Sequence, residues 1–217
     1  LAVLAAITII YGSTRALFQD DLKRRLAFST VSQVSYIALG VAIAGPIATI
    51  GGLVHLVHQG FMKITLFFCA GNYAETLGVH KVSQLAGVGR RMPWTTGAFT
   101  LAAFGMIGVP PMVGFVSKWY LGLGALEVGQ GWVVLVLAGS SLLNAAYFLP
   151  ILRTAWFDPP PDEWPRERDF GGKETAWMLL LPPLATVAAA LAWGLFASMP
   201  GTPLDWVQFI AARKYGP

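Results

Sequence analysis

Residues 92–126, MPWTTGAFTLAAFGMIGVPPMVGFVSKWYLGLGAL, form an apolar run that contains a single charged side chain, Lys118. As one straight α-helix, this run would be about 52 Å long, whereas the hydrocarbon core of a bilayer is roughly 30 Å thick. Pro110 and Pro111 remove backbone donors and break helices. The sequence therefore predicts two half-helices joined by an unwound segment at Gly108–Gly114.

The composition of the whole chain indicates a membrane protein. Of its 217 residues, 55% are hydrophobic and 12% are charged, and the mean hydropathy is +0.60. Soluble domains carry about 25% charged residues, so these charges could not cover a soluble surface. This excludes an ordinary soluble enzyme, a disordered protein and a nucleic-acid-binding protein. The single cysteine, Cys69, excludes a disulfide framework within the chain and a cysteine-rich metal site.

Six stretches are apolar and long enough to cross a bilayer, and they show no strand alternation. They are residues 1–18, 27–46, 50–72, 95–122, 130–155 and 176–198. The sequence therefore predicts an all-α, polytopic membrane helix bundle of about six transmembrane helices, one of them broken at Pro110–Pro111. The first stretch starts at Leu1 without a basic leader, so we expect a part of a longer chain rather than a signal peptide.

The basic residues predict the orientation of these helices. Eleven Lys and Arg residues lie in or beside the connections after the first, third and fifth stretches, and none lies in the connections after the second and fourth. Arg213 and Lys214 follow the last stretch. By the positive-inside rule, we expect an inner-membrane protein with cytoplasmic charged loops and a periplasmic C-terminal tail.

The third stretch carries polar side chains at membrane depth. His55, Gln59 and Lys63 recur every four residues and share one narrow face of a helix, and His58 lies close beside that face. An ionisable group inside a membrane marks a functional site by default, and lysine and histidine can both accept and release protons. We interpret this face as a proton relay. In the alternative interpretation, Lys63 extends to the membrane surface and the two histidines serve only in packing. His55 and His58 are not expected to bind a metal, because the sequence offers no third or fourth ligand.

Lys118 follows the expected helix break by one turn, and broken helices mark ion pathways in transporters. Two weaker polar stripes would either hold helices together or line a path of water molecules, and the sequence does not separate these roles. The stripes consist of Ser29, Ser32, Gln33 and Tyr36, and of Ser140, Ser141, Asn144 and Tyr147. No motif indicates a redox cofactor or a catalytic site in this chain.

Three segments together resemble the antiporter-like membrane subunits of respiratory complex I, Mrp-type cation/proton antiporters and membrane-bound hydrogenases. The segments are DLKRRLAFSTVSQVSY at 21–36, HLVHQGFMKITLF at 55–67 and GVPPMVGFVSK at 108–118. Their order and spacing make the resemblance specific over about residues 15–125. It implies the C-terminal half of such a subunit. Residues 1–155 would form its second inverted repeat of five helices, 156–175 a cytoplasmic loop, and 176–217 a final transmembrane helix and tail.

The resemblance also implies roles for individual residues. Lys63 corresponds to the central lysine, Lys118 to the lysine on the broken helix, and His55 to the first family histidine. Gln59 stands at the position of the second histidine, with His58 beside it. Tyr36 and Ser117 lie within the same motifs and complete the expected proton pathway.

The function implied is proton translocation in an NADH:quinone oxidoreductase-type complex. The expected partners are the lipid bilayer and other membrane subunits, including an N-terminal half or a neighbouring antiporter-like subunit. One alternative is a D-like subunit of an Mrp-type Na⁺/H⁺ antiporter. A second alternative is a structural membrane chain that supports the assembly of a larger complex. The chain itself would be a non-redox subunit of an NADH:quinone oxidoreductase-like (translocase) complex, without a catalytic site of its own.

Overall fold

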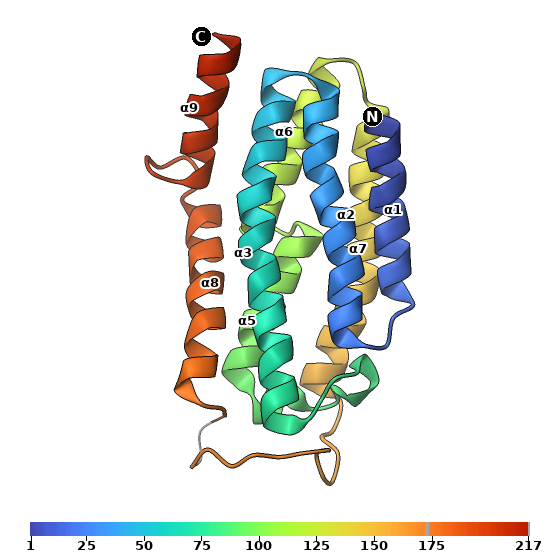
Figure 1. Ribbon diagram of the computed structural model, residues 1–217, viewed down its shortest axis with the longest axis vertical. Coiled ribbons are helices and arrows are strands. Elements are labelled where there is room, and N and C mark those ends of the chain that lie inside the picture. Colours follow the sequence, from blue (N-terminus) through green and yellow to red (C-terminus); the bar gives the residue numbers. More distant parts are fainter. Residues whose placement is uncertain (172–173, 217) are drawn as a thin grey trace.

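The computed structural model describes residues 1–171 and 174–216, and it is a bundle of helices (Figure 1). In chain order the helices are α1 (Ala2–Leu17), α2 (Leu22–Ile43), α3 (Pro46–Leu77), the 3₁₀ helix η1 (Val82–Gln84), α4 (Val88–Arg91), α5 (Pro93–Ile107), α6 (Val113–Glu127), α7 (Trp132–Phe157), α8 (Trp177–Leu195) and α9 (Pro203–Tyr215). The expected all-α bundle is confirmed. Lys173, one of the eleven basic residues counted above, lies outside the described residues, as do Gly172 and Pro217.

The apolar run at 92–126 folds as two half-helices, as expected. α5 begins at Pro93, whose missing donor does no harm in a first turn, and it ends before Gly108. Gly108 has a φ of 96°, in the left-handed region that favours glycine. α6 starts at Val113, so Gly114, expected in the unwound segment, is already helical. The two halves follow one another along the bundle, with α5 below α6 in Figure 1.

The other expected spans correspond to α1, α2, α3, α7 and α8. α2 begins earlier than expected because the Asp21 side chain caps it, accepting a hydrogen bond from the backbone N–H of Arg24 at 2.7 Å. α3 has 32 residues and is therefore about 48 Å long. By length and composition, α2, α3, α7 and α8 could each cross a membrane, and α1 is a shorter apolar helix.

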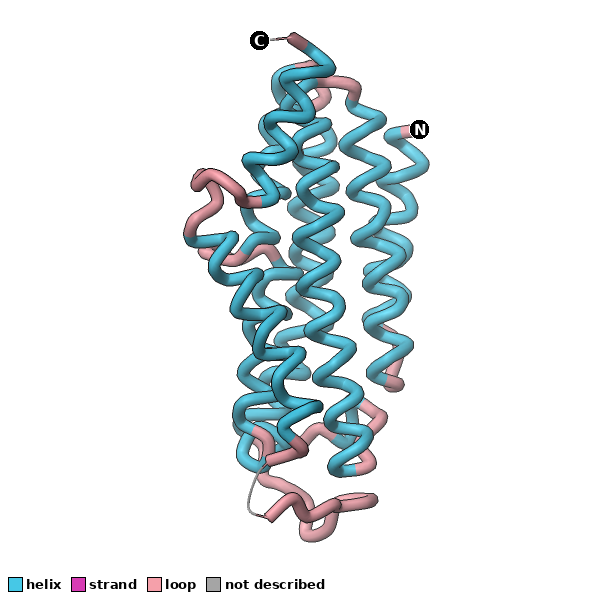
Figure 2. Tube along the Cα trace, turned by 60° about the vertical axis from the view of Figure 1, so that its left-hand side comes forward, coloured by secondary structure: helices cyan, strands magenta, loops and turns pink. Residues whose placement is uncertain are grey.

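The segment expected as a C-terminal tail contains a further helix, α9. Its first turn is capped by the Thr202 side chain, which accepts from the backbone N–H of Asp205. Leu204 and Val207 pack against Val54 of α3 in a small hydrophobic cluster. α8 and α9 follow one another along α3, and the loop between them lies in the upper half of the molecule (Figure 1 and Figure 2). A search for long apolar stretches does not predict α9, because this helix is short and amphipathic.

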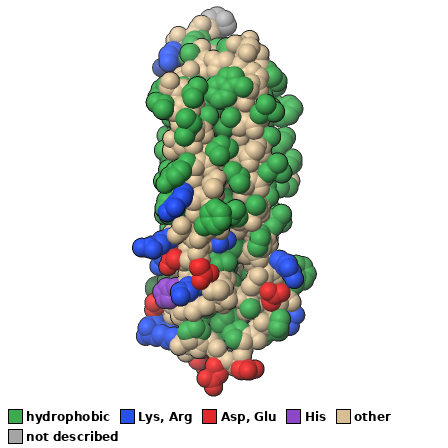
Figure 3. Space-filling view, turned by 90° about the vertical axis from the view of Figure 1, so that its right-hand side faces the viewer, with side chains coloured by type: hydrophobic (Ala, Val, Ile, Leu, Met, Phe, Trp, Pro, Cys, Tyr) green, Lys and Arg blue, Asp and Glu red, His purple; other side chains and the backbone are tan. Residues whose placement is uncertain are grey.

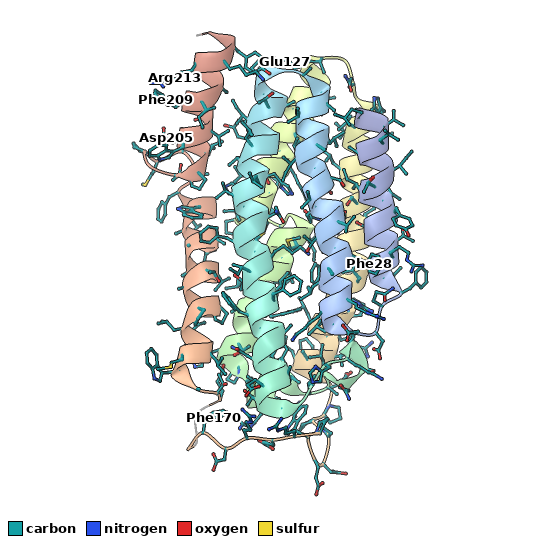
Figure 4. All side chains as sticks on the ribbon, viewed as in Figure 1. Phe28, Glu127, Phe170, Asp205, Phe209 and Arg213 are labelled. Atoms are coloured by element: carbon teal, nitrogen blue, oxygen red, sulfur yellow. The ribbon has the colours of Figure 1, made fainter. Side chains whose placement is uncertain are left out.

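On the face in Figure 3, most of the charged side chains gather at one end of the bundle, and hydrophobic side chains are spread over the rest of its length. The loop after α7 lies at this end, where Phe170 is labelled, and Glu127 lies at the opposite end (Figure 4). The loop is held in place: the backbone N–H groups of Arg166 and Arg168 donate to the carbonyls of Leu77 and Thr76 at 3.1 and 2.9 Å. Residues 166–168 of this loop therefore lie against the end of α3.

Candidate functional site

Lys63 is buried in the middle of α3, with 5% of its surface exposed. Its ammonium group donates to Ser29 Oγ and, at 3.2 Å, to the backbone oxygen of Leu26, and both partners belong to α2. A lysine that extended to the membrane surface would give up these contacts. The side chain is instead held inside the bundle between α2 and α3.

Lys118 reaches back across the helix break and closes the end of α5. Its ammonium group donates to the carbonyl oxygens of Met106 and Ile107 at 3.0 and 2.9 Å, and to Ser141 Oγ at 3.0 Å. The last carbonyls of a helix lack partners within the helix, and a cation there is further stabilised by the helix dipole. Gly108 leaves room for the lysine, since an added Cβ would lie 3.0 Å from Lys118 Cδ. The break and the lysine therefore form one structural unit.

His55, Tyr36 and Ser117 gather beside Lys118. His55 Nδ1 lies 2.8 Å from Ser117 Oγ, and the Ser117 hydroxyl donates to the Gly114 carbonyl at 3.2 Å. The centre of the Tyr36 ring lies 5.0 Å from that of the His55 ring and 5.5 Å from Lys118 Nζ. Residues expected from three separate motifs thus meet at one place, where α2, α3 and α6 face each other.

Within the described part of the chain, seven buried side-chain nitrogen and oxygen atoms lack a hydrogen-bond partner from the protein. They belong to Gln33, Tyr36, His55, His58 and Gln59. Buried polar groups in native proteins are nearly always paired, either with protein or with ordered water. These five side chains, the orphaned cluster, are therefore where internal water molecules would bind.

α8 packs directly onto the helix break. An added Cβ on Gly194 would overlap the Pro111 carbonyl oxygen and would lie 2.9 Å from the backbone nitrogen of Val113. Elsewhere at the break, a pocket of about 410 Å³ reaches Lys118 and Ser141, with a mainly apolar lining that includes Phe115, Trp119 and Leu123. Lys118 is therefore bordered by polar groups on its bundle side and by an apolar pocket on another.

The two weaker polar stripes separate in the structure. The Ser13 and Ser32 hydroxyls lie 2.8 Å apart, and Ser13 Oγ lies 3.4 Å from Ser140 Oγ, so these three hold α1, α2 and α7 together. Ser29 and Ser141 instead contact the two lysines. Each stripe therefore contains residues of both kinds.

Arg25 is a buried cation that the sequence indicated only as a loop charge. Its guanidinium group donates to the backbone oxygens of Gln19, Tyr147 and Leu17 at 2.8, 3.2 and 3.3 Å. It thereby ties the end of α1 and the middle of α7 to the start of α2. Its place in a run of basic residues gave no signal of this burial.

Comparison with known proteins gives one family match. Residues 1–144 match the family described as NADH:quinone oxidoreductase/Mrp antiporter, TM. Among curated relatives, NADH-quinone oxidoreductase subunit N of Desulforudis audaxviator (strain MP104C) is 46% identical over 161 residues. That alignment covers 74% of this chain and 32% of the relative, so the chain spans about a third of the relative's length.

Two solved structures are similar over all of this chain. One is a chain of the Mrp complex from Dietzia sp. DQ12-45-1b, with a TM-score of 0.87 and 28% identity, of which 47% is covered. The other is a chain of respiratory complex I from Thermus thermophilus with bound NADH, with a TM-score of 0.82 and 26% identity, of which 44% is covered. Both neighbours are subunits of multi-subunit membrane complexes, and the similarity extends over α8 and α9 as well.

Proposed function

We propose that this chain, which belongs to the NADH:quinone oxidoreductase/Mrp antiporter transmembrane family, translocates protons as the C-terminal part of an antiporter-like subunit in an NADH:quinone oxidoreductase-type complex. The observation that carries the proposal is the burial of Lys63 and Lys118 inside one helix bundle, each held by hydroxyl and carbonyl partners. Charged groups inside a membrane are costly and are kept where they serve transport. Both lysines can gain and lose a proton without moving out of the bundle.

The proposed route between the lysines follows the histidine side of the bundle. His55 and the orphaned cluster provide titratable nitrogens and sites for water, and both can pass protons on. Tyr36 and Ser117 border this route through their contacts with Lys118 and His55. Proton transfer of this kind needs no redox cofactor in this chain, so the driving charge changes would come from partner subunits.

We further propose the second inverted repeat for residues 1–155, a cytoplasmic loop at 156–175, and a final transmembrane segment with the tail at 176–217. The close approach of Gly194 in α8 to the backbone of Pro111 and Val113 supports a shared function of the last segment and the repeat. The partners would be other membrane subunits and the N-terminal half of the same subunit. The location would be the inner membrane, with the charged end in the cytoplasm.

A second candidate is a subunit of an Mrp-type Na⁺/H⁺ antiporter, supported by the structural similarity to the Dietzia Mrp complex. The same lysines would serve both functions, but an Mrp-type subunit would require Na⁺ for proton movement and no electron donor. Proton uptake by membrane vesicles, measured with NADH and with a Na⁺ gradient in turn, separates the two.

We expect Lys63→Ala in the full-length subunit to reduce NADH-driven proton uptake by inverted membrane vesicles about a hundredfold or more, because the relay loses a proton-carrying group. The matched control is Lys23→Ala, which removes an exposed lysine from the first turn of α2. The subunit should still assemble, since removing an intramembrane charge favours insertion. Normal uptake by vesicles that contain Lys63→Ala would refute the proposed function and favour a structural chain.

We expect Asp162→Cys in the loop after α7 to react with a membrane-impermeant maleimide only in inverted vesicles. Lys214→Cys, near the end of α9, should react only in right-side-out vesicles, because the loop after α7 and the C-terminal end of α9 lie at opposite ends of the bundle (Figure 1). The native Cys69 is fully buried and gives no background. The reverse labelling pattern would mean that the proposed orientation is wrong.

A further inference from the structure

A continuous chain of hydrogen bonds that includes no histidine joins the two lysines. This chain, named the bridge, consists of Lys63, Ser29, Tyr147, Asn144, the Met106 carbonyl and Lys118. Ser29 Oγ accepts from Lys63 and lies 2.8 Å from the Tyr147 hydroxyl. The same hydroxyl lies 2.7 Å from Asn144 Oδ1. Tyr147 of α7 is therefore connected to Lys63 through Ser29 and to Asn144 directly.

The second half of the bridge ends on a shared acceptor. Asn144 Nδ2 donates to the Met106 carbonyl oxygen at 2.9 Å. Lys118 Nζ donates to that oxygen at 3.0 Å. Two donors therefore share one backbone carbonyl oxygen at the end of α5. A stronger hydrogen bond from Asn144 weakens the attraction of this carbonyl for the Lys118 ammonium group.

The bridge cannot itself conduct protons. Ser29, Tyr147 and Asn144 are fully buried, and each has hydrogen-bond partners, in contrast to the orphaned cluster. A side-chain amide does not exchange its protons as an acid or base, and a backbone carbonyl only accepts. The bridge can therefore transmit only the effect of charge, and the proposed proton route stays on the histidine side.

Tyr147 gives the bridge two settings. Its hydroxyl carries one proton but contacts two acceptors, Ser29 Oγ and Asn144 Oδ1. A charged Lys63 donates to Ser29 and uses one of its two acceptor sites, which makes Ser29 a weaker acceptor for Tyr147 than Asn144. A neutral Lys63 can accept from the Ser29 hydroxyl, and Ser29 then becomes the better acceptor for Tyr147. Neighbouring hydrogen bonds polarise one another, so each setting changes how strongly Asn144 donates to Met106.

We propose that Tyr147 and Asn144 are positioning residues that transmit the charge state of Lys63 to Lys118 through the Met106 carbonyl, so that the two lysines carry charge in alternation. When Lys63 is charged, Asn144 donates a stronger hydrogen bond to the Met106 carbonyl oxygen. That oxygen then stabilises the Lys118 ammonium group less, and Lys118 releases its proton. When Lys63 is neutral, the carbonyl is free for a charged Lys118. This inference rests on the proposed function and adds two residues of α7 to it.

Other titratable groups surround the bridge and contribute to any pH response. α2 provides Arg25, which donates to the Tyr147 backbone oxygen, and Tyr36, whose ring faces Lys118. α3 provides His55 and His58. None of these groups is a member of the bridge, so a substitution at Tyr147 or Asn144 leaves all of them in place.

The test uses the full-length subunit in its complex and measures NADH-driven proton uptake by inverted vesicles between pH 5 and 9. Tyr147→Phe and Asn144→Leu should each lower uptake at neutral pH about fivefold, which is the effect of one net hydrogen bond. Each should also move the pH of half-maximal uptake upward by about 0.7 unit. The Met106 carbonyl then receives a weaker hydrogen bond from residue 144 or none, so it stabilises the Lys118 ammonium group more and Lys118 keeps its proton to higher pH. Since both residues act in one chain, the double variant should shift no further than either single variant.

Tyr73→Phe is the matched control. Tyr73 is equally buried and donates to Thr96 Oγ1 at 3.1 Å, away from the bridge. It should leave the pH profile unchanged. If Tyr147→Phe does not assemble, Ser29→Ala breaks the bridge from its other side and should produce the same shift.

The outcomes separate the bridge from the proposed function. If Lys63→Ala and Lys118→Ala stop proton uptake but the bridge variants behave like Tyr73→Phe, the bridge is wrong and the proposed function stands. A double variant whose effect is the product of the two single effects also overturns the bridge. If the lysine variants pump normally, the proposed function itself fails.

Discussion

Lys118→Arg in the full-length subunit is expected to stop proton translocation as completely as Lys118→Ala, by about a hundredfold or more, while the subunit still assembles. Arginine keeps the positive charge and can still donate to the carbonyls at the end of α5, but its guanidinium group does not release a proton in proteins. The comparison therefore isolates proton release from charge. The measurement is NADH-driven proton uptake by inverted vesicles, together with the amount of assembled subunit.

Lys214→Arg, near the end of α9 and exposed, is the matched control and should leave uptake unchanged. Normal uptake with Lys118→Arg would mean that Lys118 serves as a fixed charge. The route past His55 would then have to end elsewhere.

Gly114→Ala is expected to prevent stable folding of the helix break. A Cβ on Gly114 would overlap the carbonyl oxygen of Gly105 and would lie 3.3 Å from the end of the Met62 side chain. α5 and α6 touch here through backbone atoms, and Met62 of α3 lies against the same contact. The two half-helices therefore cannot move apart without disturbing the packing of α3. We expect a loss of more than about 3 kcal/mol, beyond the usual range for overpacking. The measurement is the thermal stability of the detergent-solubilised complex and the yield of assembled subunit.

Gly97→Ala provides the control within α5, because nothing lies within 4 Å of an added Cβ there. This change should be neutral or stabilising, since alanine favours a helix interior over glycine by about 1 kcal/mol. Equal thermal stability of the Gly114 and Gly97 variants would mean that α5 and α6 do not meet where the structure places their contact.

The sequence predicted the bundle, the broken helix and the buried lysines because each depends on local properties. Apolar length predicts a span, adjacent prolines predict a break, and a charge within an apolar run stands out. The position of α9 and the burial of Arg25 depend on packing between helices, which no local pattern contains. The same holds for the bridge: Tyr147 and Ser29 are 118 residues apart, and their contact depends on how α7 is rotated against α2. Helical periodicity placed both residues on polar faces but not opposite each other.

Lys118 as the cap of α5 has a mechanical consequence. The ammonium group donates to the last carbonyls of α5, so loss of its proton also weakens the hydrogen bonds that hold α5 to α6 at the helix break. This relation is reciprocal. If protonation of Lys118 stabilises one conformation of the helix break, a force that drives the break out of that conformation lowers the proton affinity of Lys118 by the same coupling free energy. A neighbouring chain that pulls on α5, or on α8 where it rests against the break, would perform work that is converted into proton release.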